Sequence, residues 1–413
     1  MSLVGSQRFT QRMSRRAGAR ERGSANGRRG WTLRRLTRRH RPMPAAQEVG
    51  TWDELLDEGP AGSRSYAVYT PPGLRAGMAV PLVVVLHGCT QSAKDAALGT
   101  EVDALADREG FVAVYPEQAA KDNPRRCWNW FDPRHQVRGS GEPAAIARIT
   151  EQVLAGARLD RNRVHVMGLS AGGAMAGILA ATYPDLYASV GIHSAPQYRA
   201  ARSAMTALLA MTNGGPNPER QGRLAYAAMG PRARVVPVIV FQGEADRAVW
   251  AGNGERVVRQ WLTTSRLASG EATRLDFARP ETSHADRVPG GLSYLVRGWK
   301  DNAGRPVVQY WTVSGLGHAW SGGASAGSYT DPRGPNATEA MWHFFTQCPQ
   351  DRDLAMTSRQ RPVPDARTQG TALGHSLKEL GGRWRRLRRN RPPKSGAVVP
   401  FRSTLNSYLE GTS

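Results

Sequence analysis

The chain has 413 residues, of which 40% are hydrophobic, and this size fits one large domain with tails or two modest domains. The formal net charge of +22 lies almost wholly at the ends: residues 1–43 hold 13 Arg and one acid, and residues 367–413 hold 10 Lys or Arg and two acids. The charge therefore gives no reason to expect specific nucleic-acid binding by the central part. The sequence contains no run of about 18 apolar residues that would span a membrane.

The three cysteines, Cys89, Cys127 and Cys348, are too few for a disulfide-stapled scaffold, and their spacing is not that of a metal site. Whether two of them are bridged stays open. The N-terminus has arginines but no apolar segment after them, so no secretory signal is readable. We expect either a cytoplasmic protein or a start codon that has been misplaced.

Residues 1–47 are rich in Arg, Gly and Ser and are expected to form a disordered basic tail, with a short basic helix at Trp31–Arg39 as the alternative. The folded domain is predicted over residues 48–348. Its first predicted elements are an edge strand at Ser65–Thr70, a buried central strand at Pro81–His87, a helix at Leu98–Glu109 and a strand at Phe111–Tyr115.

An irregular loop over residues 119–141 precedes a predicted helix from Glu142 to Ala157. Strands are then predicted at Val164–Met167, Ala188–Ile192 and Val236–Phe241, a hairpin at Leu292–Gly298 and Pro306–Val313, and a last helix at Thr338–Phe345. Strands that alternate with helices predict an α/β fold with a mostly parallel central sheet and helices on both faces. Residues 349–413 are expected to be a linker and a basic C-terminal tail, with an amphipathic helix at Leu373–Arg389 as the alternative.

The segment Gly168-Leu-Ser-Ala-Gly172 has the pattern G-x-S-x-G between a predicted strand and a helix of small residues. Such a turn raises a serine hydroxyl clear of the sheet, and the helix behind it directs N–H groups toward an anion. Taken alone, the pattern also fits a close-packing turn. Its context favours Ser170 as a nucleophile.

A serine needs a base, and the base needs an acid that orients it. Asp246 follows the strand that ends near Phe241 and fits the spacing of the acid better than its competitor Glu244. His318 lies between glycines after a later strand and is the predicted base. His193 follows the nucleophile too closely to be the last member in the order Ser, Asp, His.

The oxyanion hole is predicted from the N–H of Ala171 and, in the loop Leu86-His-Gly-Cys-Thr-Gln91, the N–H of Cys89. Cys89 as a nucleophile is the weaker interpretation, because no further histidine and acid accompany it. Trp128, Trp130 and Trp320 flank the site in sequence, and we expect them to form an apolar wall for substrate or, alternatively, to anchor loops. No cofactor and no metal are expected.

Six stretches resemble the polyhydroxybutyrate (PHB) depolymerase family of esterases, and the resemblance covers residues 64–348. The stretches are Leu86-His-Gly-Cys-Thr-Gln91, Tyr115-Pro-Glu-Gln118, Cys127-Trp-Asn-Trp130, Arg138-Gly-Ser-Gly-Glu142, Gly168-Leu-Ser-Ala-Gly-Gly-Ala-Met175 and Gly317-His-Ala-Trp320. The resemblance implies an α/β-hydrolase fold, the same triad and oxyanion loop, and an extracellular enzyme. It also implies an ester substrate, either a polyester or acyl groups on plant polysaccharides.

The sequence thus predicts a cofactor-free serine carboxylic-ester hydrolase that cleaves hydroxyalkanoate oligomers or polymers through an acyl-enzyme. The alternative is a feruloyl or acetyl esterase of the xylan-degrading type. A further alternative is a non-catalytic protein that binds surfaces through its basic tails. In each case the tails are expected to bind an anionic surface.

Overall fold

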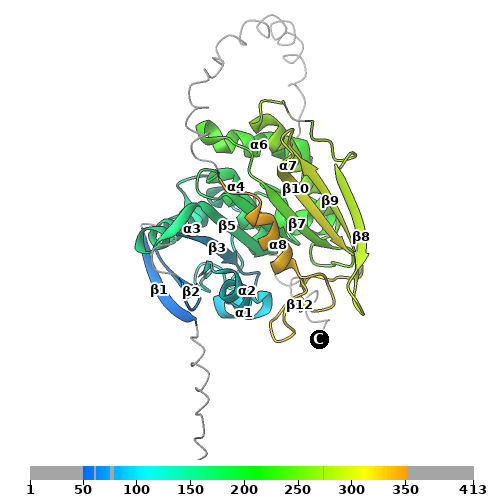
Figure 1. Cartoon of the computed structure of the whole chain (residues 1–413). Helices are drawn as coiled ribbons and strands as arrows, with labels where there is room; N and C mark the ends of the chain where they lie inside the picture. Colours follow the sequence, from blue (N-terminus) through cyan, green and yellow to red (C-terminus); the bar gives the residue numbers. More distant parts are fainter. Residues whose placement is uncertain (1–49, 60–61, 75–78, 273, 351–413) are drawn as a thin grey trace, which may run out of the picture. The chain divides into compact units, whose positions relative to one another are not determined.

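A ten-stranded sheet organises the chain, with the strand order β1-β2-β4-β3-β5-β6-β7-β10-β9-β8 (Figure 1). The computed structural model describes residues 50–59, 62–74, 79–272 and 274–350. The strands are β1 (Thr51–Gly59), β2 (Gly62–Thr70), β3 (Val80–Leu86), β4 (Val112–Pro116), β5 (Leu159–Leu169), β6 (Ser189–His193), β7 (Val238–Gly243), β8 (Thr282–Arg287), β9 (Ser293–Lys300) and β10 (Pro306–Val313). A separate pair joins β11 (Trp320–Ser321) to β12 (Thr330–Asp331).

The middle of the sheet is parallel and its two sides are antiparallel. Neighbouring strands run parallel from β4 through β3, β5, β6 and β7 to β10. The hairpin β1–β2 continues the sheet antiparallel beyond β4, and β9 and β8 do so beyond β10. The loops that follow the parallel strands therefore meet along one edge, where sites in open α/β sheets are built.

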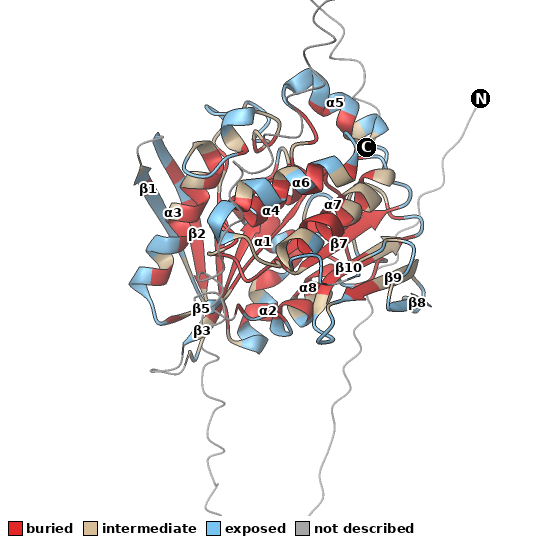
Figure 2. Cartoon of the chain, turned by 90° about the horizontal axis from the view of Figure 1, so that it is seen from above, coloured by how far each residue is buried: buried red, intermediate tan, exposed pale blue. Residues whose placement is uncertain are grey.

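Helices cover both faces of the sheet, as Figure 2 shows. Against one face pack residues of α3 (Gly141–Gly156), α4 (Ala171–Thr182), α5 (Ala204–Asn213), α6 (Pro218–Met229) and α7 (Gly252–Ala268). Against the other pack residues of α1 (Ala93–Thr100), α2 (Val102–Glu109) and α8 (Ala337–Thr346).

The two faces explain why β3 is apolar at every position. Leu82, Val84 and Leu86 belong to one hydrophobic core, while Val83 and Val85 belong to the other. Side chains alternate across a strand, so a strand covered on both sides must be apolar throughout. The predicted central strand and the mostly parallel sheet with helices on both faces are confirmed.

Three features of the fold differ from the sequence-based expectations. β2 is not an edge strand, because β1 pairs along its whole length. The helix expected at Leu98–Glu109 is two helices, which meet at Glu101 in a left-handed conformation with φ 56°. The sequence patterns also did not predict α5, α6, α7, β1 or β8.

All described residues fall in one compact unit. The two predicted basic tails and the two alternative tail helices lie outside the described residues, except for residues 349 and 350 of the C-terminal tail. Within the part that the structure describes, no helix is long and apolar enough to cross a membrane.

Candidate active site

Ser170 forms the turn between β5 and α4 by itself, because β5 ends at Leu169 and α4 begins at Ala171. Its backbone adopts φ 57° and ψ −119°, a conformation that costs a non-glycine residue about 1–3 kcal/mol. The Ser170 N–H donates a 2.9 Å hydrogen bond to the carbonyl of His193 at the end of β6. The neighbouring strand thereby holds the strained turn that carries the predicted nucleophile.

The glycines around Ser170 are required by close backbone contacts. A Cβ atom on Gly172 would lie 2.1 Å from the carbonyl oxygen of Leu86 and 2.6 Å from that of His87. One on Gly168 would lie 2.5 Å from the carbonyl carbon of Gly172. These distances are far below van der Waals contact, so strand, turn and helix pack this closely only without side chains.

Asp246 lies in the loop after β7 and is 6% exposed. Its Oδ1 accepts the N–H groups of Ala248 at 2.9 Å and Val249 at 2.8 Å. Its Oδ2 accepts from the Gln242 side-chain amide at 3.3 Å. These donors fix the carboxylate in one orientation, with Oδ2 still available to a further partner.

His318 provides that partner. Its Nδ1 lies 2.8 Å from Asp246 Oδ2, and because a carboxylate only accepts, the Nδ1–H donates and Nε2 is left to face a substrate or a serine. The competing acid, Glu244, is exposed and accepts instead from the Ser314 hydroxyl at 2.7 Å. The structure therefore brings His318 together with Asp246 and not with Glu244.

The three predicted triad residues follow β5, β7 and β10, which lie close together in the sheet. Among the described residues, no hydrogen bond joins the Ser170 hydroxyl to His318. Such bonds are often long in the absence of substrate and tighten in the complex. The role of Ser170, Asp246 and His318 as a triad stays a prediction that this arrangement supports.

The predicted oxyanion loop lies directly against the nucleophile. A Cβ on Gly88 would lie 3.7 Å from Ser170 Cβ. Ala171 is the first residue of α4, so its N–H has no acceptor within the helix. The two predicted donors, Cys89 N–H and Ala171 N–H, thus come from the oxyanion loop and from the start of α4, which both lie next to Ser170.

The backbone N–H groups of Gly88, Thr90 and Gln91 are paired within the protein, whereas that of Cys89 is not. Gly88 N–H donates to the Gln91 side chain at 2.8 Å, Gln91 N–H to the Gly88 carbonyl at 3.4 Å, and Thr90 N–H to the Arg125 carbonyl at 2.7 Å. Within the described residues, the N–H of Cys89 has no protein acceptor. An unpaired N–H beside a nucleophile is what an oxyanion hole requires.

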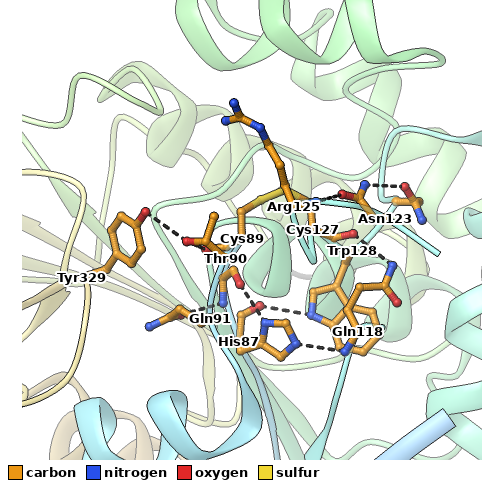
Figure 3. The surroundings of a disulfide bond; sticks show 12 residues. His87, Cys89, Thr90, Gln91, Gln118, Asn123, Arg125, Cys127, Trp128 and Tyr329 are labelled. Atoms are coloured by element: carbon orange, nitrogen blue, oxygen red, sulfur yellow. Dashed lines mark hydrogen bonds between the residues drawn. A yellow bond between two sulfur atoms is a disulfide. The ribbon is translucent and has the colours of Figure 1, made fainter. Parts of the chain in front are cut away.

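A disulfide joins Cys89 of this loop to Cys127 of the loop after β4 (Figure 3). Cys348 is free and buried. The question that the sequence left open is thereby answered, and the side chain of the predicted oxyanion residue is a covalent anchor. This pairing also argues against Cys89 as a nucleophile.

Two buried polar side chains, His87 and Glu142, hold the loop after β4 in place. His87 accepts the Gln118 N–H at its Nε2 at 3.0 Å, and its carbonyl accepts the Trp128 indole N–H at 3.1 Å (Figure 3). The Glu142 carboxylate accepts from the Gln118 side chain at 2.6 Å and from Asn129 at 2.7 Å. Sequence reasoning quoted these motifs but missed this function, because their spacing does not reveal that the motifs meet.

Burial keeps His87 and His193 neutral. It lowers the pKa of His87 to about 4 and that of His193 to about 3. His193 stacks between Phe241 and Trp320, with ring centroids 5.5 Å and 5.0 Å away. Neither residue is placed as the base, and both pack beneath the site.

The expected tryptophan wall is not what the structure shows. Trp128, Trp130 and Trp320 are 0%, 5% and 1% exposed, and the Trp320 indole N–H donates to Thr338. Side chains with almost no accessible surface offer little to a substrate. Their burial favours the alternative interpretation, in which they anchor the loops of the site.

A cavity of about 550 Å³ lies beside α5 and α6, and its lining includes Arg199, Arg202 and Arg220. None of the predicted triad or oxyanion residues lines it.

Among the described residues, no group of three or more His, Cys, Asp or Glu side chains could hold a metal ion.

A protein-family model described as "Esterase PHB depolymerase" matches residues 64–282, which is more than half of the chain. The chain belongs to the PHB depolymerase family of esterases. The predicted family is therefore confirmed.

Two relatives show the range of substrates within this similarity. Poly(3-hydroxyalkanoate) depolymerase C of Paucimonas lemoignei is 32% identical over 255 residues, which cover 60% of this chain and 57% of the relative. Feruloyl esterase B of Neurospora crassa is 28% identical over 267 residues, which cover 60% of this chain and 84% of the relative. The chain thus spans little more than half the length of the depolymerase.

The fold is also that of a solved esterase. The acetyl xylan esterase from Aspergillus awamori superposes with a TM-score of 0.58 at 19% identity, covering 72% of this chain and all of the other. Together with the parallel sheet and its two helical layers, this likeness confirms the predicted α/β-hydrolase fold of the PHB depolymerase-like domain.

Proposed function

We propose that this chain is a cofactor-free serine carboxylic-ester hydrolase. Ser170 attacks the ester carbonyl, His318 takes its proton and later passes it to the leaving alcohol, and Asp246 orients the imidazole. The N–H groups of Ala171 and Cys89 bind the oxyanion. Water then releases the acyl group from Ser170 in a second half-reaction.

One observation carries this proposal: the 2.8 Å bond between His318 and Asp246 at the sheet edge where the strained Ser170 turn lies. The unpaired Cys89 N–H beside Ser170 adds to it. Membership of an esterase family supports ester bonds as the target.

The proposed substrate is a hydroxyalkanoate oligomer or polymer, which cleavage would shorten by one ester bond at a time. The 32% identity to a poly(3-hydroxyalkanoate) depolymerase over 255 residues supports this choice. The alternative is a feruloyl or acetyl ester on a polysaccharide. The match that covers 84% of a feruloyl esterase supports that alternative.

A substrate panel tests both. The full chain and its Ser170→Ala variant would be assayed on 3-hydroxybutyrate oligomers, PHB granules, methyl ferulate, acetylated xylan and p-nitrophenyl acetate. We expect Ser170-dependent release of 3-hydroxybutyrate, with kcat/KM for the oligomers above that for methyl ferulate. The reverse order favours the feruloyl esterase. No Ser170-dependent hydrolysis of any ester contradicts the enzyme assignment and favours the non-catalytic alternative.

We also propose that the basic ends tether the enzyme to an anionic surface. Residues 1–43 and 367–413 carry net charges of +12 and +8 of the total +22, so residues between them are nearly neutral. Electrostatic tethering weakens steeply with salt. Co-sedimentation with anionic phosphatidylserine vesicles at low and high salt, compared for the full chain and residues 48–350, tests this. Equal binding by the shortened chain contradicts it.

A further inference from the structure

Tyr329 lies beside both the predicted base and the oxyanion loop, and it is not one of the predicted site residues. It stands just before β12, 45% exposed, in a left-handed conformation with φ 51°. Its ring meets the edge of the His318 ring, with centroids 6.4 Å apart. A half-exposed aromatic side chain in a strained conformation beside the predicted base needs an explanation.

The Tyr329 hydroxyl reaches the oxyanion loop. It lies 3.1 Å from Thr90 Oγ1, and Figure 3 shows the two side chains directed toward each other. The Thr90 hydroxyl itself donates to the Cys89 carbonyl. A hydroxyl has one proton, so Thr90 must accept from Tyr329, and the hydrogen bonds run from Tyr329 through Thr90 to Cys89.

This chain of bonds fixes the peptide group that follows the predicted oxyanion donor. The Cys89 carbonyl accepts from the Thr90 hydroxyl, and the Thr90 N–H donates to Arg125 at 2.7 Å. Thr90 has φ 67°, which a β-branched residue rarely adopts without such support. The Tyr329 hydroxyl therefore helps to hold Thr90 in a conformation that leaves the Cys89 N–H unpaired.

The Tyr329 segment is itself held from both sides. The Gln91 side chain donates to the Ser328 carbonyl at 3.0 Å, and the Ser328 N–H donates to Asp95 at 3.0 Å. The first bond connects the loop that follows His318 with the oxyanion loop, and the second connects it with α1. They keep the Tyr329 ring in place even though much of it faces solvent.

We propose that Tyr329 is a positioning and specificity-determining residue for ester hydrolysis. Through Thr90, its hydroxyl orients the Cys89 N–H, and its exposed ring supplies the aromatic wall for the substrate that the buried tryptophans do not. The proposal rests on the proposed function, because it takes Cys89 N–H as an oxyanion donor and His318 as the base.

A double-mutant cycle tests the hydroxyl. Tyr329→Phe and Thr90→Val are each expected to lower kcat on p-nitrophenyl acetate about three- to tenfold, as loss of one neutral hydrogen bond does. KM is expected to stay within twofold. The kcat of the double variant is expected to be no lower than that of the less active single variant. Thr90→Ser is expected to retain near wild-type kcat. Additive losses, or a Tyr329→Phe variant equal to wild type, overturn the positioning role.

Tyr329→Ala tests the ring, because it removes the wall as well as the hydroxyl. We expect it to raise KM for aryl and oligomeric esters at least fivefold relative to Tyr329→Phe, while KM for the acetyl ester changes less. Equal KM values for the two variants on every substrate overturn the specificity role. Tyr226→Phe on α6, which removes an exposed hydroxyl away from the site, is the matched control and is expected to leave both constants unchanged.

The outcomes also separate this proposal from the proposed function. If Ser170→Ala abolishes hydrolysis while Tyr329→Phe is unaffected, the enzyme assignment stands and the Tyr329 inference fails. If Ser170→Ala retains activity, the proposed function fails first. Urea unfolding of each variant checks that a lower rate does not come from a smaller folded fraction.

Discussion

His318 Nδ1 lies 2.8 Å from Asp246 Oδ2, although 72 positions separate these residues in the sequence. Asp246 follows β7 and His318 follows β10, and the two strands pair in parallel from Val308 opposite Val238 to Val313 opposite Gly243. The acid–base pair is therefore a direct product of this strand register. A slip of one residue would shift the two loops relative to each other. It would also turn every side chain of the slipped strand to the other face of the sheet.

Replacing the predicted nucleophile is the first test. Ser170→Ala is expected to lower kcat for ester hydrolysis by about six decades, because members of a triad act as a unit. Thermal unfolding should change little, since alanine keeps the backbone turn. A variant with activity within tenfold of wild type contradicts the assignment of Ser170.

The acid is tested by a matched pair of amide substitutions. Asp246→Asn is expected to lower kcat by about four decades, because an amide favours the wrong imidazole tautomer. Glu244→Gln, in the same loop but bonded to Ser314, is expected to stay within threefold of wild type. A large effect of Glu244→Gln and a small one of Asp246→Asn would identify the other carboxylate as the acid.

The disulfide is expected to support both stability and rate. Cys89→Ser with Cys127→Ser should lower the free energy of unfolding by about 2–4 kcal/mol, because the open chain gains conformational freedom when unfolded. It should also lower kcat at least tenfold by loosening a predicted oxyanion donor. Urea unfolding and steady-state rates measure the two effects.

Reductant supplies the control for that experiment. Dithiothreitol is expected to lower the rate of the wild-type enzyme and leave the double variant unchanged. Thiol titration of the denatured, unreduced wild-type chain should find a single thiol, that of Cys348. Three thiols, or equal rates with and without the bridge, contradict the prediction.

The close contact at the nucleophile turn gives a stability test within one helix. Gly172→Ala would place Cβ 2.1 Å from the Leu86 carbonyl oxygen and is expected to destabilise the fold by about 1–3 kcal/mol or more. Gly177→Ala lies in the same helix, where the nearest atom to a new Cβ is 3.4 Å away on Ile192. It is expected to be neutral or stabilising by up to about 1 kcal/mol. Equal unfolding free energies for the two variants contradict this explanation of the glycine pattern.

Acid is expected to destabilise the fold through buried histidines. Burial lowers the pKa of His87 to about 4 and those of His165 and His193 to about 3, all below the usual 6.5. Between about pH 6 and pH 4 these imidazoles are protonated only in the unfolded chain, so stability falls as pH falls. Asp103 acts in the opposite direction, because burial raises its pKa from 3.8 to about 6 and its extra proton is held by the folded state.

For these four groups taken together the net difference is about two protons, which corresponds to about 2.7 kcal/mol per pH unit. Urea unfolding at several pH values between 7.5 and 4.5 measures this slope. His165→Gln removes one of the three imidazoles at a position that stacks on Phe345, away from the site. It is expected to reduce the slope by about 1.4 kcal/mol per unit. An unchanged slope in that variant contradicts the linkage.

Much of the fold was predictable from the sequence because its central strands are apolar on both faces. The continuous apolar run of β3 indicated a covered parallel strand, and the hairpin of β9 and β10 followed from the turn at Asp301 to Gly304. α5 was missed because its polar and apolar faces are weakly separated, whereas α6 and α7 were missed although both are clearly amphipathic. The break at Glu101 was missed because a left-handed glutamate has no sequence signature.

The site was predictable where chemistry fixes the residue type and unpredictable where packing decides. Ser170, Asp246 and His318 follow strands in a recognisable order, and the glycines around Ser170 indicate a tight turn. Exposure cannot be read from residue type, so Trp128 was expected to contact substrate, with loop anchoring as the alternative, and it is buried. Tyr329 carried no motif and was not considered.

The burial of His87 and His193 has a consequence for how the enzyme's rate is read against pH. Both rings stay uncharged far into the acid range, and each has its nitrogens engaged by neighbouring groups. Neither His87 nor His193 therefore exchanges a proton over the pH range in which the rate is measured. The acid limb of kcat/KM should consequently carry no contribution from these two rings, so its shape reports other groups of the enzyme.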